Sequence, residues 1–62
     1  MTTDEAIAVF LSINPVSERW TLEGMRFETN GSSTYEEERA IEMTGMLKGF
    51  IDGLKYCGNE IS

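Results

Sequence analysis

The stretch ERWTLEGMRFET, Glu18 to Thr29, decides the fold, because it reads either as a β-hairpin or as a short helix. With a two-residue turn at Glu23-Gly24, strand alternation separates the large apolar side chains from the polar ones. The apolar face then holds Trp20, Leu22, Met25 and Phe27. The same register pairs Leu22 with Met25, Thr21 with Arg26, Trp20 with Phe27 and Arg19 with Glu28. A single apolar face together with an opposite-charge pair predicts a hairpin over about residues 18–28.

A second interpretation of this stretch stays open. Glu-Gly is a weaker turn signal than Asn-Gly, and Ser17, placed after Pro15, is a residue type that caps helices. The hairpin would give an α+β chain in the order helix–β-hairpin–helix (αββα), whereas a short helix would give an all-α chain. We predict the α+β fold for one small domain over residues 1–62, with the all-α fold as the alternative.

Upstream of the hairpin, the sequence predicts a helix over about residues 3–13. Thr2 precedes Glu5 by three residues, which is the spacing of a capping box. Pro15 ends this helix, because the residue before a proline is disfavoured in the helical conformation. Since the segment from Ala6 to Ile13 is almost entirely apolar, we expect the helix to be largely buried. Its core-facing side holds Ile7, Phe10 and Leu11.

Downstream of the hairpin, a long helix is predicted over about residues 34–57. Ser33 and Thr34 each precede a glutamate by three residues, so either is a candidate cap. Gly58 is a suitable residue to end the helix. We expect Cys57 to be a small buried hydrophobe at the end of the helix's apolar stripe. That stripe consists of Ala40, Met43, Leu47, Phe50, Ile51, Leu54 and Cys57.

Three glycines, Gly45, Gly49 and Gly53, recur every four residues on a side of the long helix away from this stripe. Each costs about 1 kcal/mol relative to alanine in a helix interior. Three explanations remain open: a second backbone packs closely against the glycines, the helix bends or breaks near Gly45 or Gly49, or the glycines are neutral. We expect a partner-binding or self-association face, here called the glycine face, made of Gly45, Gly49, Gly53, Met46 and Tyr56.

The chain is acidic, with 11 Asp and Glu residues against 5 Lys and Arg, and its formal net charge is −6. A direct nucleic-acid binder usually carries a basic patch, so we expect no direct nucleic-acid binding. A protein with a basic surface is the partner that this charge favours. The expected acidic face consists of Glu36, Glu37, Glu38, Glu42 and Asp52.

The sequence lacks residues that several kinds of catalytic or structural site require. The chain has no histidine, so Ser-His and Cys-His nucleophile pairs are excluded, and Cys57 is the only cysteine, which rules out an internal disulfide. The apolar run from Ala6 to Ile13 is too short to span a bilayer. We expect no enzymatic activity, no cofactor or metal and no membrane association. One thiol without a secretion signal fits the cytoplasm.

These features predict a small non-catalytic protein that binds a protein partner. We expect a stoichiometric inhibitor or modulator of the phage or mobile-element type, such as an anti-defence protein, that blocks a basic nucleic-acid-binding surface. A homodimer is expected, because so small a domain buries little of its surface. Two alternatives are a structural subunit of a phage particle or larger homo-oligomeric assembly, and a transcription regulator that acts through protein contact.

Overall fold

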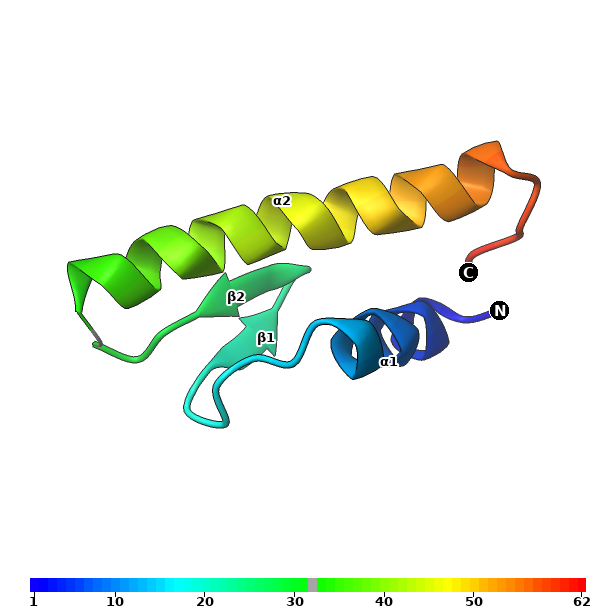
Figure 1. Cartoon of the computed structure of the whole chain (residues 1–62). Helices are drawn as coiled ribbons and strands as arrows, with labels where there is room; N and C mark the ends of the chain where they lie inside the picture. Colours follow the sequence, from blue (N-terminus) through cyan, green and yellow to red (C-terminus); the bar gives the residue numbers. More distant parts are fainter. Residues whose placement is uncertain (32) are drawn as a thin grey trace.

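The protein, seen in a computed structural model that describes residues 1–31 and 33–62, has two helices on either side of a β-hairpin (Figure 1). Helix α1 spans Thr3–Ile13, strand β1 Thr21–Glu23, strand β2 Arg26–Glu28 and helix α2 Thr34–Tyr56. Helix α2 extends along the whole molecule, and the hairpin and α1 lie beneath it as a second layer (Figure 1). The predicted α+β order is confirmed, and the all-α alternative is wrong.

Helix α1 begins at the predicted capping box. The Thr2 hydroxyl accepts a hydrogen bond from the Glu5 N–H at 3.0 Å, and Glu5 Oε1 accepts one from the Thr2 N–H at 2.9 Å. Two backbone donors that a helix start leaves unpaired are thereby satisfied. The helix ends at Asn14, whose N–H donates to the Phe10 carbonyl at 2.8 Å.

Helix α2 is one unbroken helix of 23 residues. Of the two candidate caps, Ser33 is used, since its hydroxyl accepts a hydrogen bond from the Glu36 N–H at 3.3 Å. Of the three explanations for the glycines, the one in which the helix ends near Gly45 or Gly49 to make two shorter helices is therefore wrong. At the other end Gly58 has φ +92°, a conformation that glycine adopts without a side-chain penalty.

The hairpin forms, but its turn is Gly24-Met25 and not Glu23-Gly24. Both turn residues have positive φ, +55° and +66°, as a two-residue type I′ turn requires. Moving the turn by one residue moves each cross-strand partner by two, so the apolar side chains keep their common face. The observed register pairs Thr21 with Glu28, Leu22 with Phe27 and Glu23 with Arg26.

This register corrects the expected Arg19–Glu28 pair. Glu28 instead forms an ion pair with Arg26 on its own strand, at 2.9 Å. The observed register places Glu23 directly opposite Arg26, but the Arg26 guanidinium donates to Glu28 instead. It also leaves Met25, half-buried despite its positive φ, in contact with the core.

The core lies between the inner face of α2 and the layer beneath it. The Phe10 and Phe50 rings, 5.6 Å apart, join α1 to α2, and the Trp20 and Phe27 rings lie 6.0 Å apart on the hairpin. Much of the predicted apolar stripe of α2 is buried, as expected. The buried apolar residues are Ala6, Phe10, Phe27, Ala40, Met43, Leu47 and Ile51.

Two burial predictions are wrong. Cys57 is exposed, because it caps the end of α2, beyond the part of the helix that the core buries. Helix α1 is not largely buried either, since Val9 and Ile13 are 41% and 66% exposed. The reason is that α1 lies against α2 and makes no close approach to either strand, so only one of its sides is covered.

The two chain ends lie side by side (Figure 1). The Thr3 N–H donates to the Ser62 carbonyl at 2.9 Å, and the Ser62 N–H donates to the Met1 carbonyl at 3.3 Å. Ile61, the residue before Ser62, is half-buried and packs against the core.

Candidate protein-interaction surface

The glycine face lies on the outer side of α2. Gly45, Gly49 and Gly53 are exposed, and a Cβ atom added at any of them would meet no atom of residues 1–31 and 33–62 within 4 Å beyond the local helix. Packing among these residues therefore gives no reason for glycine at the three positions. The explanation that a second backbone approaches here stays a prediction, alongside the neutral one.

Large apolar and aromatic side chains flank the three glycines. Met46 is 51% exposed and Tyr56 is 93% exposed, and both share the outer side of α2 with the glycines at helical spacing. Tyr35, 67% exposed, lies toward the N-terminal end of the same side. Exposed tyrosine is a residue type that contributes strongly to protein–protein contacts when a partner buries it.

The predicted acidic residues divide among three sides of α2. Glu38 and Glu42 are exposed and share the side that carries the glycines, by the period of the helix. Asp52 is exposed at the border of that side and lies 3.8 Å from the Lys48 ammonium. Glu37 is also exposed, but it lines a hollow next to β2.

Glu36 is directed differently from the other predicted acidic residues. It is half-buried on the inner side of α2, and its Oε2 accepts a hydrogen bond from the Trp20 indole N–H at 3.3 Å. This carboxylate therefore helps to hold the hairpin against the helix. Of the predicted acidic residues, Glu38 and Glu42 lie on the outer side of α2, with Asp52 at its border.

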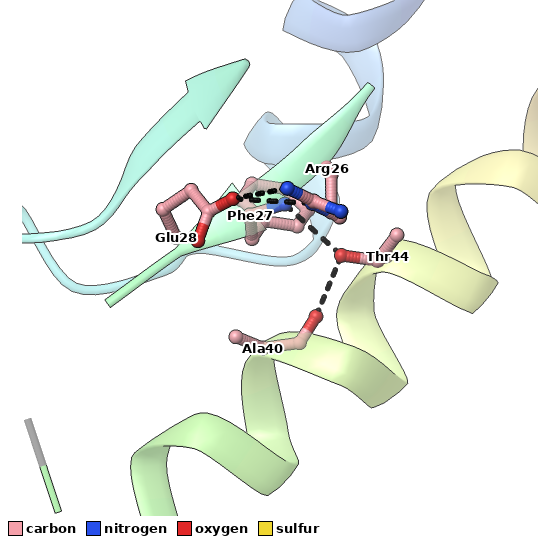
Figure 2. A network of polar contacts seen from close by, with 5 residues as sticks. All are labelled: Arg26, Phe27, Glu28, Ala40 and Thr44. Atoms are coloured by element: carbon pink, nitrogen blue, oxygen red, sulfur yellow. Dashed lines mark hydrogen bonds and ion pairs between the residues drawn. The ribbon is translucent and has the colours of Figure 1, made fainter. Parts of the chain in front are cut away.

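The side of α2 that meets β2 was not identified as a site from the sequence. There the Phe27 N–H donates to the Thr44 hydroxyl at 3.0 Å, and that hydroxyl donates to the Ala40 carbonyl at 2.7 Å (Figure 2). The Arg26–Glu28 ion pair lies beside this contact (Figure 2).

Two hollows adjoin the contact between Thr44 and β2. The N-terminal hollow, about 360 Å³, is lined in part by Glu28, Glu37 and Ile41, and the C-terminal hollow, about 410 Å³, in part by Lys48 and Lys55. A signal for this side was present in the sequence, as a second set of positions with alternating spacings of four and three. The set, here called the side face, is Glu37, Ile41, Thr44, Lys48, Ile51 and Lys55.

Residues 1–31 and 33–62 contain no group of three or more His, Cys, Asp or Glu side chains arranged to hold a metal ion. Within the same residues, neither helix combines the length and the apolar character needed to cross a bilayer. The features of the described surface that stand out are therefore its shape, its charge and its exposed apolar groups.

Comparison with protein-family models, with curated proteins and with solved structures found no match to this chain.

Proposed function

We propose that the protein is a non-catalytic binding protein whose glycine face docks on a basic surface of a protein partner. The observation that carries this proposal is the open space above Gly45, Gly49 and Gly53 in an unbroken helix. The three glycines cost about 3 kcal/mol of helix stability, at about 1 kcal/mol each. A contact that is possible only because glycine has no side chain would offset that cost.

The geometry of such a contact follows from the absence of Cβ atoms. A partner backbone can lie closer to a glycine surface than to any other, which increases dispersion contacts along the helix. Tyr56, which shares the sector of the glycines, and Met46, at its edge, supply apolar area that the partner would bury. Their exposure favours a lasting contact at this face.

The charge on this side favours a basic partner. Glu38 and Glu42 lie next to the glycines, and the chain as a whole carries −6. Such a field speeds association with a basic surface and weakens as salt is added. We place the protein in the cytoplasm as a stoichiometric inhibitor or modulator of the phage or mobile-element type, which covers a nucleic-acid-binding surface of its partner.

The test is affinity capture from host lysate with three immobilised forms. These are the wild type, Gly49→Leu, and Ala8→Leu, which adds bulk to the exposed side of α1. Proteins that bind the glycine face should be retained by the wild type and Ala8→Leu, lost with Gly49→Leu, and released as salt is raised. Capture of the same proteins by all three forms would contradict the proposal.

A second candidate is a subunit of a larger homo-oligomeric assembly. It is favoured by exposed large side chains that lie on different sides of the molecule, namely Ile13, Ile41 and Tyr56 at 66%, 72% and 93% exposure. Light scattering distinguishes the two, because an assembly gains mass with concentration in the absence of any other protein. A mass that stays at one or two chains would exclude the assembly.

A further inference from the structure

The C-terminal hollow gathers positive charge on an acidic protein. Of the five cationic residues in the chain, Arg26, Lys48 and Lys55 line it. Apolar side chains also line it, from the buried Ile51 and the half-buried Met25. The hollow thus offers an apolar surface bordered by cations, which suits an apolar side chain accompanied by a carboxylate.

The N-terminal hollow carries the complementary groups. Ile41, at 72% exposure, projects from α2 beside it, and Glu37 lies one helical turn away on the same side. Neither Glu37 nor Lys55 forms an ion pair within the residues that the structure describes. Both charges are therefore available to a partner. Because Arg26 and Thr44 line both hollows, the two adjoin along one side of the protein.

The side-face positions of α2 are spaced by 4, 3, 4, 3 and 4 residues, so the spacing is the same in either chain direction. An antiparallel copy of α2 can therefore align with it position by position. If two copies lie antiparallel with the two-fold axis level with residue 46, residue i of one faces residue 92 − i of the other. Glu37 then faces Lys55, Ile41 faces Ile51 and Thr44 faces Lys48. One register thus satisfies the exposed isoleucine and both unpaired charges at once.

We propose that two copies of the chain form a two-fold homodimer through the side face, with their α2 helices antiparallel. Ile41 of each copy enters the C-terminal hollow of the other and packs on Ile51, and Glu37 of each copy pairs with Lys55 of the other. The contact is isologous, so each of these pairings occurs twice. An antiparallel arrangement also places the opposite ends of the helix dipoles together.

The dimer differs from the contact proposed for the glycine face. The side face and the glycine face lie on different sides of α2, so dimerisation leaves two copies of the glycine face exposed. The two proposals are independent, because Gly49→Leu acts on one and substitutions at Glu37 or Lys55 act on the other. A small anionic ligand fits the C-terminal hollow less well, because Asp52 lines it and lies 3.8 Å from the Lys48 ammonium, which is one of its three cations.

The test is a charge exchange measured by sedimentation equilibrium. Glu37→Lys and Lys55→Glu each place two like charges together in the dimer, so each should weaken dimerisation by about tenfold or more. The double variant restores two opposite-charge pairs and should recover most of the wild-type affinity. Glu38→Lys is the matched control, since it makes the same change at the neighbouring residue, which does not line the hollow.

The apolar part of the contact has its own test. Ile41→Asp should abolish the dimer, whereas Val9→Asp, at an exposed apolar residue of α1, should leave it intact. Circular dichroism on each variant verifies that the fold is kept. A folded Ile41→Asp that dimerises like the wild type would overturn the proposal.

A distance measurement fixes the register. A spin label on Cys57, which is exposed, lies 11 residues from the two-fold axis, so two labels should be about 33 Å apart along the helices. A parallel pair would hold them close together. A wild type that stays monomeric up to about 1 mM, charge exchange without recovery, or a short label distance would each refute the dimer.

Discussion

The backbone N–H of Phe27 and the hydroxyl of Thr44 are joined by a hydrogen bond of 3.0 Å across the contact between β2 and α2 (Figure 2). Glu23 and Arg26 flank the turn of the hairpin, and Leu22 and Phe27 form the next pair. At that next pair of an antiparallel hairpin, the backbone N–H and C=O groups point away from the opposite strand. The Phe27 N–H therefore has no partner on β1. Thr44 supplies that partner from the helix, and so ties the free edge of β2 to α2.

We expect Thr44→Val to lower the free energy of unfolding by about 1–3 kcal/mol, because it keeps the side-chain shape but leaves the Phe27 N–H unsatisfied. Thr44→Ser retains the hydroxyl and should cost less. Urea denaturation followed by circular dichroism measures both. Equal losses for valine and serine would show that the hydroxyl is not what stabilises this contact.

The outer glycines should respond to alanine in the opposite direction from Gly58. Gly49→Ala adds a Cβ atom into open space within a helix, so it should raise the free energy of unfolding by about 1 kcal/mol. Gly58→Ala should lower it by about 1 kcal/mol, because φ +92° is unfavourable for any residue with a Cβ atom. Thermal unfolding of both variants beside the wild type measures the difference. A Gly49→Ala variant that is less stable than the wild type would contradict the open outer face.

The capping box of α1 should make stability depend on pH. Hydrogen bonds from the Thr2 backbone N–H, and then from the Thr2 side chain, hold the pKa of the Glu5 carboxyl below its usual value. The stability that this lowered pKa contributes is fully present above the pKa of Glu5 in the unfolded chain. It is lost as pH falls through the lower pKa of Glu5 in the folded chain. Native-state carbon shifts of the Glu5 carboxyl, followed against pH, report the folded pKa directly.

The matched variant for this pH effect is Glu5→Gln, which keeps an oxygen acceptor for the Thr2 N–H but does not titrate. Its unfolding free energy should fall less steeply on acidification than that of the wild type. If the wild type and Glu5→Gln lose stability in parallel over the pH range in which carboxyl groups titrate, the capping box contributes nothing to the pH dependence.

Cys57 should react with a thiol reagent in the folded protein, because its side chain is exposed just past the end of α2. We expect one equivalent to be modified in native buffer, with no loss of helix signal by circular dichroism. Protection of the thiol until denaturant is added would instead support the buried position that the sequence pattern suggested.

Local patterns predicted the helices well and the hairpin only in part. The spacing of Thr2 and Glu5, the position of Pro15 and the glycine at position 58 each act within one turn of chain, so their physics is readable without the fold. The turn depends on which residues tolerate positive φ. Met25 adopts it although it is not glycine, and its half-buried side chain packs against the core.

Burial and site geometry were harder to predict, because they depend on which segments cover one another. Cys57 follows the spacing of the buried stripe, yet its side chain is exposed at the end of the helix. Glu36 looked like one of several surface carboxylates, yet it receives the indole N–H of Trp20 from a segment 16 residues away. The common side of Gly45, Gly49 and Gly53 could be predicted, because residues four apart lie on the same side of a helix.

The pairing of the two chain ends has a consequence for engineering the topology. Since the Ser62 N–H already bonds the Met1 carbonyl at 3.3 Å, a peptide linker of a few residues would join the ends into a circular backbone. Closure would restrict the unfolded chain far more than the folded one, so the circular form should unfold at a higher temperature. New ends could then be opened at the Gly24-Met25 turn, which would separate the contribution of the hairpin connection from that of the packing around it.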